Sequence, residues 1–332
     1  MNILDQVKRT SGCSKVRSGC DWGLLCALTI LFAAGSALAR QNPQRFAISK
    51  DVNLVLLPVA VTNAQGKSVS GLGASNFRVY ENGRQQQLSL FRAEDIPVTV
   101  GLVVDHSGSM VAWRDQVIQG ARAFIQASNV QDREFVVNFG SEVKLALPAD
   151  VPFTNSIEEL EEALSLPYTS GKTALYDALA SALQHIREDK INKKVLLLIS
   201  DGGDNASLHT FKQVLRMAQS ANVLIYSIGL LDELSADQNP AVLKKVAAAT
   251  GGDSYFPSSA AEVVRYCRTI AADIRHQYTL GYNPTAESNS GYRKIRVRVT
   301  APGIGKLLTR TRPGYFSPSA TVEHTPTEGQ DQ

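Results

Sequence analysis

The stretch that decides the fold is Val98–Met110, with the sequence VTVGLVVDHSGSM. It predicts a buried strand that runs into a polar turn, because a short apolar run rich in β-branched residues ends there at a turn signal. The turn carries one carboxylate and two hydroxyls at alternate positions, Asp105, Ser107 and Ser109. Ligands of open parallel sheets bind just beyond the carboxyl ends of the strands. Hard oxygen atoms gathered at such a place suit Mg²⁺.

The D-x-S-x-S pattern alone is weak evidence, since a chain of this length carries it by chance roughly one time in ten. Two downstream residues strengthen it. Thr173 opens a predicted amphipathic helix, and Asp201 follows a predicted buried strand, VLLLI, in the same strand-to-loop position as Asp105. If the two strands are neighbours, five residues converge at the carboxyl edge of one sheet: Asp105, Ser107, Ser109, Thr173 and Asp201.

Strands and helices alternate between residues 98 and 276. This alternation predicts an α/β fold with a doubly wound, mostly parallel sheet and helices on both faces. The short segment 143–147 is expected to be an antiparallel partner. The other predicted strands lie at 98–104, 135–139, 195–199, 223–228 and 254–256. The predicted helices lie at 111–128, 156–164, 173–187, 208–221, 241–249 and 260–276.

Two β-rich segments flank this region, an N-terminal one at 40–96 and a C-terminal one at 278–316. In the first, Asn82-Gly83 is a strong hairpin signal, which predicts a turn between strands 77–81 and 88–91. We expect the flanks to pair into one small accessory β module, since chain termini often lie close together. Residues 317–332 lack periodicity, which predicts a disordered tail.

The predicted strand at 293–300 alternates basic and apolar residues. This pattern favours a solvated strand face over a basic interaction surface. The basic residues have no aromatic residues between them, as a platform for single-stranded nucleic acid would require.

The N-terminus carries the pattern of a secretory signal peptide, with basic residues, a short apolar run and an A-x-A motif at 37–39. This pattern predicts a signal peptide at 1–39 and an exported protein that is periplasmic, in the cell envelope or extracellular. The alternative is an uncleaved membrane anchor, because the apolar run can be counted through Leu38. The run is shorter than the roughly 20 residues of a membrane span, which favours cleavage.

Removal of residues 1–39 takes away four basic and two acidic side chains, which leaves 30 basic against 29 acidic. The overall charge of +3 is therefore no sign of nucleic-acid binding. Three of the four cysteines lie in the removed segment, so Cys267 would stand alone and no intramolecular disulfide is expected.

The order of these motifs resembles the von Willebrand factor A (VWA) domain with its metal-ion-dependent adhesion site. The resemblance rests on D-x-S-x-S, a Thr that opens a TALYDAL helix, the S-D-G-x-D turn and the strand I-Y-S-I-G. The flanks, with E-D-I-P-V-T-V, Y-T-L-G-Y-N-P and T-R-P-G-Y-F, resemble a bacterial exported subfamily of VWFA-related proteins frequent in Acidobacteria.

The resemblance implies a VWA domain at 97–277 that binds Mg²⁺, Mn²⁺ or Ca²⁺. By position, Ser107, Ser109 and Thr173 would contact the metal directly. Asp105 and Asp201 would act directly or through water. One coordination position would stay open for an Asp or Glu carboxylate of a protein partner. Asp204 is a weaker candidate, either a residue that supports these ligands or an ordinary turn residue.

The expected function is non-catalytic, metal-dependent binding of a protein. The alternative is a structural scaffold of an envelope complex in which the metal only stabilises the fold. A nucleotide hydrolase is disfavoured, because the P-loop-like segment Ser170–Thr173 lacks the required Gly at Leu166. A serine hydrolase is disfavoured by the absence of a G-x-S-x-G motif at Ser107. We expect no nucleotide and no nucleic acid as ligand, and membrane contact only through an uncleaved signal segment.

Overall fold

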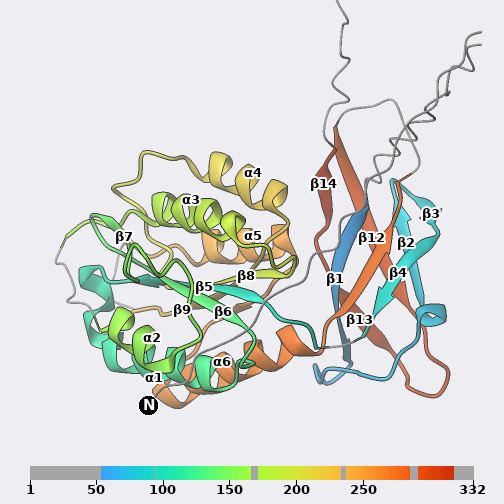
Figure 1. The fold of residues 1–332 in the computed structure, drawn as a ribbon, viewed down its shortest axis with the longest axis horizontal. Coiled ribbons are helices and arrows are strands. Elements are labelled where there is room, and N and C mark those ends of the chain that lie inside the picture. The colour runs from blue at the N-terminus through green and yellow to red at the C-terminus, as the bar shows by residue number, and fades with distance from the viewer. Residues whose placement is uncertain (1–53, 94, 166–170, 233–236, 285–290, 318–332) are drawn as a thin grey trace, which may run out of the picture. The chain divides into compact units, whose positions relative to one another are not determined.

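The computed structural model describes residues 54–93, 95–165, 171–232, 237–284 and 291–317 (Figure 1). The predicted signal peptide and residues 318–332 of the predicted tail lie outside this range. Within it, no helix is both long and apolar enough to cross a membrane.

A six-stranded sheet forms the centre of the α/β domain, in the order β10-β9-β8-β5-β6-β7. All neighbouring pairs are parallel except β6 and β7, which are antiparallel as expected. The predicted doubly wound, mostly parallel sheet is confirmed. The strands are β5 (Thr99–Asp105), β6 (Arg133–Phe139), β7 (Val143–Leu145), β8 (Lys194–Ser200), β9 (Leu224–Gly229) and β10 (Ser254–Tyr255).

Helices cover both faces of this sheet (Figure 1). One face packs against α1 (Arg114–Gln126), α2 (Ile157–Leu164) and α6 (Ala260–Arg275). The other packs against α3 (Leu175–His185), α4 (Phe211–Ala221) and α5 (Pro240–Thr250). Three short 3₁₀ helices complete the described helices: η1 (Ala74–Asn76), η2 (Gly108–Trp113) and η3 (Ile186–Glu188).

Strand β5 is buried along its whole length because it supplies both cores. Leu102 and Val104 face the core beneath α1 and α6, whereas Val103 faces the core beneath α3. Alternation of side chains between the two faces of a strand explains this division. The all-apolar sequence of β5 is therefore what a central parallel strand requires.

The order in which the chain adds strands to the sheet reverses at β5. Strand β6, the next along the chain, pairs with one edge of β5, and β8 pairs with the other. The carboxyl ends of β5 and β8 therefore lie at the point where the strand order reverses, which is the usual ligand site of open α/β sheets.

The flanking segments form two antiparallel four-stranded sheets, in the orders β13-β1-β11-β4 and β14-β12-β2-β3. Strand β1 lies between two C-terminal strands, and β12 pairs with β2. The predicted pairing of the two flanks is thus confirmed. The strands are β1 (Val55–Asn63), β2 (Phe77–Glu81), β3 (Arg84–Gln86), β4 (Leu88–Arg92), β11 (Tyr278–Tyr282), β12 (Tyr292–Val299), β13 (Leu307–Arg310) and β14 (Gly314–Phe316).

The predicted hairpin at Asn82-Gly83 forms, with positive φ angles of 47° and 85°. Its return strand is β3, however, and the expected partner, β4, pairs with β11 in the other sheet. The apolar side chains Leu88 and Phe91 explain the difference, because they pack against the core between the two sheets.

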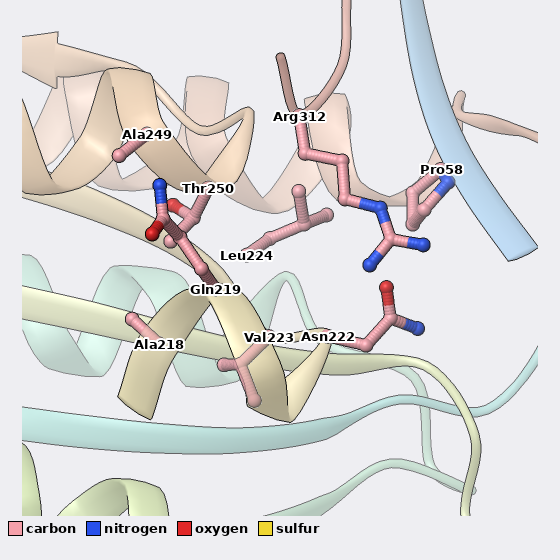
Figure 2. A pocket seen from close by; sticks show the side chains of 9 residues that line it. All are labelled: Pro58, Ala218, Gln219, Asn222, Val223, Leu224, Ala249, Thr250 and Arg312. Carbon is pink, nitrogen blue, oxygen red and sulfur yellow. The ribbon is translucent and has the colours of Figure 1, made fainter. Parts of the chain in front are cut away.

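Two arginines of the β module lie where it meets the α/β domain, and Arg310 forms ion pairs across this contact. Arg310 of β13 forms ion pairs with Asp253 and with Asp273 of α6. Arg312 donates a hydrogen bond of 2.9 Å to the Leu56 carbonyl. Figure 2 shows the Arg312 side chain pointing toward Pro58 and Asn222 in a pocket of about 10 Å³. That volume is room for about one water molecule, so this pocket is too small for an organic ligand.

Candidate metal centre

Asp105 occupies the carboxyl end of β5 and is fully buried. Its Oδ1 accepts a hydrogen bond from the Ser107 N–H (2.9 Å), and its Oδ2 accepts one from Ser200 Oγ (2.6 Å). Burial raises the pKa of this carboxyl to about 6; the hydrogen bonds from Ser107 and Ser200 oppose the shift, and the nearby charge of Asp201 adds to it. A carboxylate buried beside a second one is an environment that a cation would stabilise.

Asp201 follows β8 and contacts the turn after β5. Its Oδ2 accepts a hydrogen bond of 2.7 Å from Ser109 Oγ, and Ser109 Oγ lies 3.2 Å from Ser107 Oγ. Its Oδ1 accepts from the Gly203 N–H at 2.9 Å. The predicted neighbours Asp105, Ser107, Ser109 and Asp201 therefore form one continuous cluster of carboxylate and hydroxyl oxygens.

Thr173 reaches the same edge of the sheet by way of its backbone. Its N–H donates to Asn205 Oδ1 (2.7 Å), and its carbonyl accepts from the N–H groups of Asn205 and Ala206. The residue is only 7% exposed. No described hydrogen bond joins its hydroxyl to the four clustered residues. Thr173 also lies two residues before α3 and does not open it, because Ala174 is the N-cap.

Asp204 contacts the start of α3 and a serine of its own loop. Its Oδ1 accepts hydrogen bonds from the Tyr176 N–H (3.1 Å) and from Ser207 Oγ (2.5 Å). A carboxylate is favoured there, since the first N–H groups of a helix lack partners within the helix. Asp204 therefore holds the loop after β8 against the helix that follows Thr173.

Two supporting residues were not identified firmly from the sequence. Ser200 hydrogen-bonds to Asp105, and its Oγ also accepts from the Gly202 N–H at 3.0 Å. The only feature of the sequence that pointed to Ser200 was its position directly before Asp201. Asn205 had no such signal, because its contact with Thr173 depends on two loops that only the folded chain brings together.

The four histidines that the structure describes make no described hydrogen bond to Ser107 or Ser109. His185 bonds to the Pro152 carbonyl, His209 to Asp177 and His276 to the Ala272 carbonyl. Burial lowers the pKa of His106 to about 4, so its ring is neutral at pH 7.

The donor set fits a hard divalent ion. In the part of the chain that the structure describes, no three His, Cys, Asp or Glu side chains gather as a metal site. A metal at the end of β5 must therefore rely on hydroxyl as well as carboxylate oxygens, a set that suits Mg²⁺ or Mn²⁺ better than softer ions. Asp105, Ser107, Ser109 and Asp201 supply such oxygens from adjacent turns.

Comparison with known proteins agrees with this architecture. The sequence profile of the von Willebrand factor type A domain matches residues 99–266, which is half of the chain. The chain therefore belongs to the von Willebrand factor type A family. An uncharacterized protein of Borreliella burgdorferi is 28% identical over 138 residues, which are 41% of this chain and 38% of that protein. The chain thus matches well under two thirds of this relative's length.

Three solved structures are similar to the chain at low sequence identity. A von Willebrand factor type A protein of Catenulispora acidiphila is 14% identical, with a TM-score of 0.49 and 73% of each chain covered. Proximal thread matrix protein 1 of the mussel byssus, with a zinc-occupied MIDAS motif, is 15% identical, with a TM-score of 0.48, over 60% of this chain and 50% of that one. Manganese-loaded TRAP of Plasmodium vivax is 14% identical, with a TM-score of 0.44, over 72% of this chain and 99% of that one.

Proposed function

We propose that this protein is a non-catalytic module that binds a protein partner through a divalent ion. Asp105, Ser107, Ser109, Thr173 and Asp201 would hold the ion, which is Mg²⁺ or a similar divalent cation. The observation that supports this most is the cluster of two buried carboxylates and two hydroxyls at the switch point of the sheet. When bound, the ion would offer a coordination position to an Asp or Glu carboxylate of the partner.

The residues of the chain have distinct parts in this proposal. Asp105 and Asp201 neutralise the ion, and Ser200 and Gly203 orient their carboxylates by hydrogen bonds. The loop that carries Thr173 is held in place by Asn205, while Asp204 fixes the start of α3. This preorganisation lowers the conformational cost of binding.

Export of the protein is part of the proposal and rests on the predicted signal peptide at 1–39. The site would then act in the periplasm, in the cell envelope or outside the cell, where the partner must also lie.

The competing role is a structural scaffold whose ion only stabilises the fold. The double variant Asp105→Ala/Thr173→Ala separates the two, with Asp150→Ala as control, because Asp150 is exposed on a loop. The measurements are capture of proteins from envelope extract, with and without EDTA, and the melting temperature Tm of the purified chain. Loss of EDTA-sensitive capture by a variant that is still folded at the assay temperature supports the binding role. A lower Tm with capture retained contradicts it and supports the scaffold.

A further inference from the structure

The outer face of the sheet β14-β12-β2-β3 contains a groove of about 620 Å³. Its lining includes Tyr80, Tyr292, Lys294, Arg296 and Arg298. The groove lies on the β module and shares no residue with the candidate metal centre. Its volume is in the range of sites that bind small molecules or short chain segments.

Strand β12 divides its basic residues between two faces. Arg293 points inward, where its guanidinium forms a buried ion pair with Glu81 at 2.7 Å. Lys294, Arg296 and Arg298 are exposed and alternate with the buried residues of the strand. Alternate residues of a strand lie about 6.7 Å apart, so these three cations form a regular row.

The neighbouring strands add no negative charge to this face. Across from β12, Tyr80 lies opposite Arg296, Arg78 opposite Arg298 and Phe316 opposite Tyr292. The described strand residues of this face are therefore basic, aromatic or neutral. Arg78 is partly engaged, because its guanidinium donates to the carbonyls of Ser75 and Phe77. The other positive charges of this face belong to Lys294, Arg296 and Arg298 of β12.

Aromatic rings border the row on two sides. The Arg298 guanidinium lies 5.5 Å from the centre of the Tyr80 ring. The rings of Tyr292 and Phe316 meet edge to face, 5.1 Å apart, and their residues are 37% and 43% exposed. Strand β12 has no aromatic residue between its basic residues. Aromatic rings nevertheless lie beside them: Tyr80 from β2, Phe316 from β14 and Tyr292 at the start of β12.

We propose that this groove binds an extended acidic peptide segment of a partner protein, with carboxylates at alternate residues. An extended peptide repeats its side chains on one face every 6.7 Å or so, which matches the spacing of Lys294, Arg296 and Arg298. Arginine binds carboxylates through paired hydrogen bonds, and the exposed rings offer apolar contact to the residues next to them. The binding is separate from the metal and does not depend on it.

Two fluorescein-labelled peptides of equal composition test the spacing. One alternates Thr and Glu and ends in Tyr; the other carries the same three Glu residues consecutively. Fluorescence anisotropy with the full chain at low ionic strength is the measurement, because salt screens exposed charges. The alternating peptide is expected to bind at least about 5-fold more tightly, and EDTA is expected to leave its affinity unchanged.

The variant Arg296→Gln/Arg298→Gln tests the site. It is expected to weaken binding of the alternating peptide about 10-fold. The matched control is Lys245→Gln/Arg268→Gln, which removes two exposed cations of the α/β domain and is expected to bind as the wild type does. Circular dichroism melting of both variants verifies folding.

Three outcomes would overturn the proposal. The first is equal affinity for the two peptides, and the second is wild-type affinity in Arg296→Gln/Arg298→Gln. The third is tighter binding of a thymidine oligonucleotide or of polygalacturonate, which would assign the groove to another class of polyanion. If the arginine variant does not fold, Lys294→Gln alone is used, with an expected loss of about 3-fold.

Discussion

The Oγ atom of Ser109 donates a hydrogen bond of 2.7 Å to Oδ2 of Asp201, although 92 positions separate the two residues. This contact joins the turn after β5 to the turn after β8. The two halves of the candidate metal centre therefore depend on each other, and a change in either turn acts on the whole site.

Magnesium is expected to stabilise the folded chain, because a ligand that binds only the folded state raises the free energy of unfolding. At a hundred times the Kd, this increase is about 2.7 kcal/mol. Asp201→Asn keeps the shape of the side chain but removes one of the two charges, so its Tm should not respond to Mg²⁺. Calorimetry with MgCl₂ and with EDTA measures this. Asp150→Asn, on an exposed loop, should respond as the wild type does. A wild-type Tm that ignores Mg²⁺ contradicts the expectation.

Glu134 should make the folded chain less stable as the pH rises. Burial raises the pKa of its carboxyl from 4.5 to about 7, and its Oε2 has no hydrogen-bond partner among the described residues. Between these two pH values the folded state binds one more proton than the unfolded state, so the free energy of unfolding falls with increasing pH. The full loss is about 3 kcal/mol and is complete above pH 7.

The variant Glu134→Gln isolates this effect. At pH 8 it should unfold at a higher urea concentration than the wild type, and below pH 4.5 the difference should vanish. Urea titrations at both pH values provide the comparison. An equal difference between variant and wild type at pH 4 and pH 8 would show that Glu134 does not titrate as expected.

A side chain at position 101, in the middle of β5, should destabilise the fold because no space is left for it. A Cβ there would lie 2.6 Å from the Leu196 side chain and would also overlap the Phe135 ring. Gly101→Ala should therefore lower the free energy of unfolding by about 1–3 kcal/mol, the range for overpacked cores. Chemical denaturation measures it. Gly291→Ala, with nothing within 4 Å of its Cβ, is the control. Equal stability of the two variants would show that β5 and its neighbours can move apart.

Cys267 should be inert in the folded chain. Its side chain is buried in the core beneath α6, and burial raises the pKa of the thiol to about 12. Almost no reactive thiolate is therefore present at pH 8. Iodoacetamide treatment followed by peptide mass spectrometry should show modification of Cys267 only after denaturation. Rapid modification under native conditions would mean that α6 opens readily.

The central sheet, and the places of the two carboxylates of the candidate metal centre, could be predicted from the sequence alone because both depend on local patterns. Apolar strands that end in Asp105 and Asp201 are recognisable one at a time, and the rule for parallel sheets brings their carboxyl ends together. The two carboxylates lie as expected, each hydrogen-bonded to the loop that follows its strand. Their role as metal ligands stays a prediction.

Features that depend on contacts between distant loops could not be predicted in this way. Asn205 supports Thr173 across 32 positions, and the polar strand β3 (RQQ) carries no apolar alternation that would distinguish it from a loop. The basic row on β12 was recognised, but its aromatic neighbour Tyr80 comes from a strand more than 200 positions away in the chain. Such pairings follow from topology and not from the local sequence.

Isothermal titration with MnCl₂ is the most direct test of the proposed metal centre. The wild-type chain is compared with Asp105→Asn/Asp201→Asn and with Asp150→Asn. We expect one Mn²⁺ per wild-type chain, the same affinity in Asp150→Asn, and an affinity at least about 100-fold lower in the double variant, since changes merely around a metal ligand already cost 10- to 100-fold. Unchanged Mn²⁺ affinity in the double variant, or no Mn²⁺ binding by the wild type, would contradict the account.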